Sequence, residues 1–153
     1  MTKQDYGAKP HIMGVEIKDL KTFYSDDGSF TELGRFGPYG KLQINLSVLE
    51  PGAIKAFHLH NMQEDFWMTT EPLLVGLFDG REDSPTFGTK MRFVLCNQML
   101  RIPEGVLHGA ANLGASPRSL IYAVTNFFNP EDPDEERYPW DYLGKDFWEM
   151  TRG

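Results

Sequence analysis

The sequence predicts an all-β domain, either a sandwich or a barrel, and two features of the chain support this. The first is a series of short apolar segments rich in Val, Ile, Leu, Phe and Tyr. The second is the turn residues that bound these segments, such as Asp79-Gly80 and Asn129-Pro130. Short apolar segments between closely spaced turns are typical of β-sandwiches and β-barrels. Before residue 130 no segment keeps a 3.6-residue apolar period over three turns, so no long helix is expected there.

Four strands follow from the apolar segments, at 42–49, 73–78, 91–95 and 120–128. The first of them alternates in polarity, and neighbouring side chains of a strand point to opposite faces. One face carries Leu42, Ile44, Leu46 and Val48, and the other carries Gln43, Asn45 and Ser47. Two arrangements fit this pattern. Either the polar side chains lie on a wet outer face, or they line a polar cavity inside a barrel.

The composition changes at residue 131. The acidic, proline-interrupted stretch at 131–136 predicts a solvated loop. Aromatic residues are frequent between 138 and 148, which predicts a tail that docks on the outside of the barrel or on a partner subunit. We therefore predict a single domain over 1–153, with a barrel at about 14–130 and an acidic and aromatic tail at 131–153.

Length, charge and cysteine content limit the possible functions. The chain has 153 residues and a net charge of −7, which disfavours nucleic acid as a partner. Cys96 is the one cysteine, so no internal disulfide is possible. The polar residues 1–5 predict no secretory signal, and no apolar stretch is long enough for a membrane span. A cytoplasmic protein with a small-molecule ligand is the expectation.

Three histidines form the pattern with the clearest chemistry. His58 and His60 share one face of a predicted strand, Glu64 follows four residues later, and His108 comes just after a turn. Three imidazoles and a carboxylate suit one divalent ion, which could be Fe, Mn, Ni, Cu or Zn. The alternative is that these histidines are hydrogen-bonded barrel residues without a metal. No organic cofactor is expected.

The segments around these histidines match the two halves of the cupin signature. The first half, G-x5-H-x-H-x3-E, runs over 52–64, and the second, P-x-G-x2-H-x3-N, runs over 103–112. The chain therefore resembles the cupins, which implies a double-stranded β-helix barrel with jelly-roll topology, to which the short C-terminal aromatic tail is added.

Several further motifs, in the same order, resemble one cupin branch, the dTDP-4-dehydrorhamnose 3,5-epimerases, over about 14–148. They are SPTFG at 84–88, IPEGVLHG at 102–109, YAVTNFF at 122–128, Q-x-N-x-S at 43–47 and GSFTE at 28–32. The resemblance implies proton removal next to the C4 ketone of a nucleotide-linked sugar, and return of a proton from the opposite face. It also implies carbohydrate biosynthesis as the setting.

The resemblance also implies roles for individual residues. His58 falls on the position of the family's base and Tyr122 on that of its acid. Substrate contacts are implied for Gln43, Asn45, Lys55, Phe30, Glu32 and Phe128. A homodimer is implied as well, in which the strand with Phe30 and Glu32 reaches the site of the neighbouring subunit.

Departures from the family pattern leave the function open. Lys55 and Asp27 replace two arginines that contact the nucleotide, His60 replaces a glutamine, and Glu64 replaces a lysine near the enolate oxygen. The last two changes create the predicted metal set of His58, His60, Glu64 and His108. The family's C-terminal aspartate, which supports the base, has no obvious counterpart.

Three hypotheses follow. The first is a sugar epimerase or isomerase that acts next to a carbonyl, with or without a metal. The second is another metal-dependent cupin enzyme, an oxygenase or a small-molecule isomerase. The third is a sugar-binding cupin without catalysis. A metal held by His58 would occupy its lone pair, so His58 serves as either base or ligand, but not both.

Overall fold

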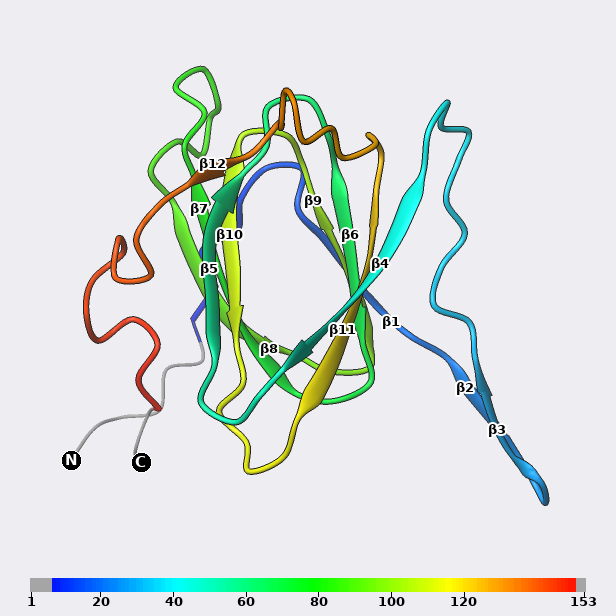
Figure 1. Cartoon of the computed structure of the whole chain (residues 1–153). Helices are drawn as coiled ribbons and strands as arrows, with labels where there is room; N and C mark the ends of the chain where they lie inside the picture. The colour runs from blue at the N-terminus through cyan, green and yellow to red at the C-terminus, as the bar shows by residue number, and fades with distance from the viewer. Residues whose placement is uncertain (1–6, 151–153) are drawn as a thin grey trace.

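The computed structural model describes residues 7–150, and the polar stretch at 1–5 considered above lies outside them. Two five-stranded antiparallel sheets face each other, and a separate two-stranded hairpin projects from one side (Figure 1). No helix among residues 7–150 is long and apolar enough to cross a membrane. The architecture is the all-β jelly-roll barrel that the sequence predicts.

The first sheet has the strand order β1-β9-β6-β11-β4. Its strands are β1 (Glu16–Asp19), β4 (Gln43–Leu49), β6 (Asp65–Thr69), β9 (Gln98–Ile102) and β11 (Arg118–Val124). The second sheet has the order β12-β5-β10-β7-β8. Its strands are β5 (Ile54–Leu59), β7 (Leu73–Asp79), β8 (Lys90–Leu95), β10 (Val106–Ala111) and β12 (Glu136–Arg137).

From β4 to β7 and from β8 to β12 the chain passes from one sheet to the other at every connection. Residues close in sequence therefore face each other across the interior. The main core between the sheets is apolar and includes Leu77, Leu100 and Val106, each at most 1% exposed. The other end of the interior carries the polar groups described below.

Each of the four predicted strands is present. The last of them is shorter than expected, because β11 ends at Val124 and residues 125–128 continue as irregular chain. There the backbone N–H of Thr125 donates to the carbonyl of Glu64, and the N–H of Phe128 donates to the side-chain oxygen of Gln43. These bonds turn the chain over one end of the barrel.

The polar side chains at the start of β4 lie inside the barrel and not on its outer face. Gln43 and Asn45 line the interior cavity, while the side chains of Ile44, Leu46 and Val48 point outward and are 65%, 65% and 55% exposed. β4 is also the last strand of its sheet. An apolar stripe on an edge strand is a surface to which another strand or chain could be added.

The aromatic tail docks on the outside of the second sheet. Phe147 and Trp148 pack against Phe57 of β5, with ring centroids 6.0 and 5.2 Å from that of Phe57. Gly76 of β7 makes room for them, since a Cβ there would lie 2.4 Å from the Phe147 ring. Docking on the barrel is therefore the arrangement that this chain adopts.

The hairpin consists of β2 (Thr22–Ser25) and β3 (Gly28–Thr31), which pair only with each other (Figure 1). Its aromatic side chains are exposed, with Phe23 at 51%, Tyr24 at 85% and Phe30 at 66%. A lone two-stranded hairpin is at best marginally stable in water. Its exposed aromatic residues therefore suggest a surface that is covered in an assembly.

Candidate active site

A cavity of about 500 Å³ lies between the two sheets at the polar end of the barrel. This size is typical of small-molecule sites. Its polar lining contains all but one of the pocket residues predicted from the sequence: Gln43, Asn45, His58, His60, His108 and Tyr122. The exception is Glu64. Asp65, Asp134 and Glu135 also line the cavity and were not predicted.

His58 is held by a carboxylate from the acidic stretch. Its Nδ1–H donates to Oε1 of Glu135 over 2.9 Å, and the side chains are 18% and 24% exposed. A carboxylate at Nδ1 fixes the ring orientation and leaves the Nε2 lone pair free. Histidine held in this way is arranged to accept a proton at Nε2.

The strand β12 explains why Glu135 reaches His58. β12 adds to the edge of β5 in antiparallel register, with Arg137 opposite His58 and Glu136 opposite Leu59. The residues just before β12 then pass over the end of β5. The prediction of a solvated loop at 131–136 is therefore wrong for 134 and 135, which are half-buried in the cavity wall. Glu135 also supplies a carboxylate partner for His58. The sequence alone showed no counterpart of the aspartate that supports the base in the family.

Two pKa shifts describe this pair. Burial lowers the pKa of His58 below its ordinary value, although Glu135 acts in the opposite direction. Burial would raise the pKa of Glu135, but the hydrogen bond from Arg137 and the charge of His58 outweigh burial and lower it. The pair therefore holds a neutral imidazole and an ionised carboxylate near neutral pH.

Tyr122 faces His58 from the other sheet. His58 is on β5 of the second sheet and Tyr122 on β11 of the first, and both line the cavity. Lys55 lies near the phenol, with its Nζ 5.4 Å from the ring centroid, and it donates to the hydroxyl of Ser47 over 2.7 Å. The cavity thus has an imidazole on one wall and a phenol on the opposite wall.

Of the predicted substrate contacts, four lie at this cavity. Gln43 donates to Asn45 over 2.9 Å, and Phe128 and Lys55 complete the group. Phe30 and Glu32 do not line the cavity. Phe30 is on the projecting hairpin, and Glu32 pairs with Arg35. Within one subunit, therefore, these two residues are away from the cavity.

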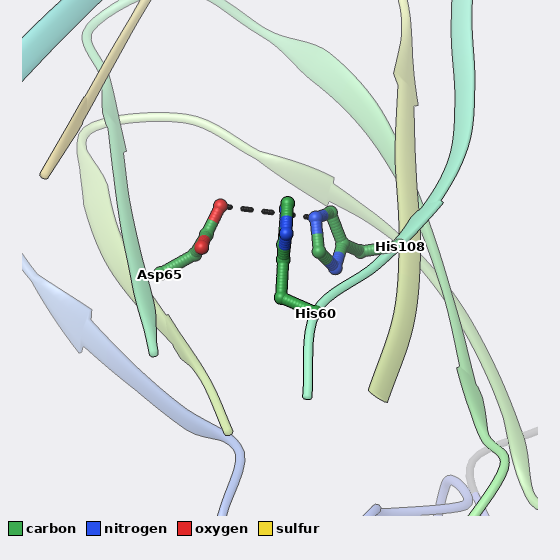
Figure 2. A group of neighbouring side chains, drawn as sticks. All are labelled: His60, Asp65 and His108. Carbon is green, nitrogen blue, oxygen red and sulfur yellow. Dashed lines mark ion pairs between the residues drawn. The ribbon is translucent and has the colours of Figure 1, made fainter. Parts of the chain in front are cut away.

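Three further side chains converge in the cavity. Figure 2 shows those of His60, Asp65 and His108 pointing toward one another, and their nearest ligand atoms all lie within 4.8 Å. Nε2 of His108 is 3.7 Å from Oδ2 of Asp65. Burial lowers the pKa of His108, which is 3% exposed.

The four residues of the predicted metal set, His58, His60, Glu64 and His108, are not all brought together. Glu64 pairs with Arg101 and also accepts from the hydroxyl of Tyr39, and it does not line the cavity. Asp65 and Trp67 share one face of β6 and line the cavity, as does Gln63 just before the strand. Glu64, which also precedes β6, does not line the cavity. His58 is not a member of the converging group either. The carboxylate that faces the histidines is Asp65.

Comparison with known proteins identifies the family of this chain. The model of the dTDP-4-dehydrorhamnose 3,5-epimerase family matches residues 14–143. The chain is 41% identical to the spore coat polysaccharide biosynthesis protein SpsL of Bacillus subtilis, over 85% of this chain and 91% of that protein. It is 35% identical to the probable low-salt glycan biosynthesis epimerase Agl13 of Haloferax volcanii, over 86% and 90%.

Solved structures show the same fold. A dTDP sugar isomerase from Desulfovibrio desulfuricans superposes with a TM-score of 0.79 at 24% identity, over 95% of this chain and 94% of that one. The dTDP-4-dehydrorhamnose 3,5-epimerase of Bacillus anthracis, solved with TDP and pyrophosphate bound, gives 0.76 at 21% identity, over 94% and 92%. The family match spans most of the chain, and this protein therefore belongs to the dTDP-4-dehydrorhamnose 3,5-epimerase family, a group of isomerase-type enzymes.

Proposed function

We propose that this protein epimerises a nucleotide-linked 4-keto sugar, with His58 as base and Tyr122 as acid. The observation that carries the proposal is their placement on opposite walls of one cavity, His58 on β5 and Tyr122 on β11. Epimerisation next to a ketone needs a base on one face of the sugar and an acid on the other. The two sheets supply one group each.

The first step is proton removal. A carbon next to the C4 ketone loses a proton to Nε2 of His58, and the C–H electron pair moves into the ring to form an enolate with its charge on the ketone oxygen. Glu135, 2.9 Å from Nδ1, stabilises the imidazolium that results. Glu135 acts through His58, so it is a positioning residue.

The second step returns a proton from the other wall. The Tyr122 O–H bond breaks, its proton forms the new C–H bond on the opposite face of the carbon, and the enolate electrons restore the ketone. Proton exchange with water then resets the protonation of both residues.

Two observations support a substrate that carries a nucleotide: the family of the chain and the residues at the cavity rim. Lys55 is the one Lys or Arg among the described lining residues, and Phe127 and Phe128 lie at the same cavity. An ammonium group suits a phosphate oxygen, and aromatic rings suit a nucleobase. Relatives named as dTDP-sugar enzymes make a thymidine diphosphate sugar the first candidate.

We infer that the active form is a homodimer. The hairpin with Phe30 and the outward stripe of Ile44, Leu46 and Val48 are apolar surfaces that the described chain leaves open to water. A second copy would cover both and bring Phe30 and Glu32 to its partner's cavity. Analytical ultracentrifugation of wild type and Leu46→Glu tests this: a dimer that the variant converts to monomer is expected, and a monomeric wild type would contradict it.

The proposed reaction is tested with a panel of 4-keto sugars, each supplied free and linked to a nucleoside diphosphate. Products are separated and their configuration is assigned by NMR. Epimer formation from a nucleotide-linked sugar, and its loss in both His58→Asn and Tyr122→Phe, is expected. Turnover by a folded His58→Asn variant at the wild-type rate, or binding without any epimer, would refute the proposal. The second result would favour a sugar-binding protein.

A further inference from the structure

We infer that His60, Asp65 and His108 form a binding site for one divalent transition-metal ion that opens into the cavity. The site differs from the one expected from the sequence in its carboxylate and in leaving out His58. It does not depend on the proposed reaction, since it is argued from these three side chains and their partners alone.

The hydrogen bonds around the two histidines fix their tautomers. Nδ1–H of His108 donates to the carbonyl of Val106 over 2.9 Å, and Nδ1–H of His60 donates to the carbonyl of Asp134. A carbonyl oxygen only accepts, so in each neutral ring the proton sits on Nδ1. Nε2 of each ring therefore carries a lone pair, which is the form that binds a metal.

Asp65 is fixed in the same manner. Nε2 of Gln63 donates to one carboxylate oxygen over 2.9 Å, and Nε1 of Trp67 donates to the other over 3.2 Å. Asp65 is only 4% exposed. Among residues 7–150, Lys55 is the one Lys or Arg that lines the cavity, and it donates to Ser47. Metal-binding carboxylates and histidines are commonly held by outer hydrogen bonds of this kind.

A positive charge between His60, Asp65 and His108 would be favourable. A buried carboxylate faces an imidazole nitrogen across 3.7 Å, and with the Nδ1 tautomer no proton lies between them. Buried charges in proteins are paired or coordinate metals. A cation bound by the carboxylate and both Nε2 atoms satisfies all three groups at once.

The dimensions suit a first-row divalent ion. Ligands bound at about 2.1 Å stand roughly 3–4.2 Å apart around one ion. The pair formed by His108 and Asp65 is already in that range at 3.7 Å, and the largest separation in the group is within 4.8 Å. Small side-chain rotations would bring all three ligand atoms to bonding distance of one ion. Two imidazoles and one carboxylate favour Zn²⁺, Fe²⁺ or Co²⁺ over Mg²⁺ and Ca²⁺, which prefer oxygen ligands.

This arrangement also separates the metal from the base. Nδ1 of His58 bonds to Glu135, and His58 is outside the converging group, so a bound ion leaves its Nε2 free. An ion held by three protein ligands keeps open positions toward the cavity. In such a position it would accept a carbonyl or enolate oxygen as a Lewis acid.

Co²⁺ titration of the untagged, chelator-treated protein tests the site without using activity. Visible d–d bands that saturate at one equivalent, and that Zn²⁺ abolishes by displacement, are expected. Asp65→Asn and His60→Gln should each weaken Co²⁺ binding by about 100-fold or more. Loss of a residue that only supports a ligand typically costs about 10–100-fold, and loss of a ligand should cost more. Two different variants guard against one that fails to fold, and circular dichroism of each metal-free variant checks this.

The matched control is Glu64→Gln, which removes the neighbouring carboxylate that pairs with Arg101 outside the cavity. It should bind Co²⁺ as the wild type does. Absence of Co²⁺ and Zn²⁺ binding in the wild type would overturn the inference, as would unchanged binding in both folded variants. Loss of binding in Glu64→Gln with retention in Asp65→Asn would instead place the ligand at Glu64.

Discussion

Replacing Glu135 with Gln tests the support that the carboxylate gives to the base. The substitution keeps the shape of the side chain and the possibility of a hydrogen bond to Nδ1 of His58, which now spans 2.9 Å. It removes the negative charge that would stabilise the imidazolium formed during proton removal. Turnover should therefore fall while the fold is retained.

The size of the effect follows from Coulomb's law. Two unit charges about 4 Å apart interact by about 1 kcal/mol in water and about 4 kcal/mol at an effective dielectric constant of about 20. The side chains of His58 and Glu135 are 18% and 24% exposed, so the pair lies between these limits. With tenfold in rate per about 1.4 kcal/mol, kcat/KM should fall between about 5-fold and about 1,000-fold, and about 70-fold at the midpoint.

The assay is the pH profile of kcat/KM for wild type, Glu135→Gln and the control Glu131→Gln, an exposed carboxylate of the same acidic stretch. The base must be neutral, so the rate falls as pH drops through the pKa of His58. Glu135 raises that pKa, while Lys55 and Arg137 lower it. Removing the Glu135 charge should therefore move the acidic limb to lower pH. An unchanged rate and limb, or equal losses in both variants, would refute the role assigned to Glu135.

Three other changes have defined outcomes. In Tyr122→Phe, NMR should detect proton exchange at the substrate carbon without epimer formation, and normal epimer formation would contradict the acid role. Asp79→Asn should cost about 2–3 kcal/mol, or roughly 4–12 °C in Tm, because fully buried Asp79 accepts from Arg81 over 2.8 Å and from two hydroxyl groups. These bonds outweigh burial and lower the pKa of Asp79. Its contribution to the free energy of unfolding is therefore present above about pH 4 and fades below it. The urea midpoints of wild type and variant should converge in acid. Gly76→Ala should release the aromatic tail, because the new Cβ would lie 2.4 Å from the Phe147 ring; limited proteolysis should cut the variant's tail faster than the wild type's.

The sequence predicted the fold because its strands carry their own signals. Short β-rich segments between turns predicted β4, β7, β8 and β11, and alternation within β4 placed Gln43 and Asn45 either in the cavity or on the surface. Only the structure could decide between these, since the pattern is the same in both. The decision left Ile44 and its apolar neighbours outside, where a second chain can cover them.

The site was predictable where residues lie within one strand and was missed where the chain returns from far away. His58, His108 and Tyr122 were found from their motifs. Glu135 was missed because 77 residues separate it from His58, and its approach depends on the register of β12 against β5. The cupin signature points to Glu64, whereas the carboxylate that faces the histidines belongs to its neighbour Asp65, the first residue of β6. The alternate positions 63, 65 and 67, all of which line the cavity, are the signal in the sequence that points to Asp65.

The central claim is that this cavity moves protons at a carbon next to a ketone, and solvent deuterium incorporation tests it most directly. Wild type and His58→Asn are incubated in D₂O with a thymidine diphosphate-linked 4-keto sugar, and the carbons beside the ketone are followed by NMR. The account predicts deuterium at one or both of these carbons with the wild type and none above background with the variant. A folded wild type that binds the sugar and incorporates no deuterium would contradict it.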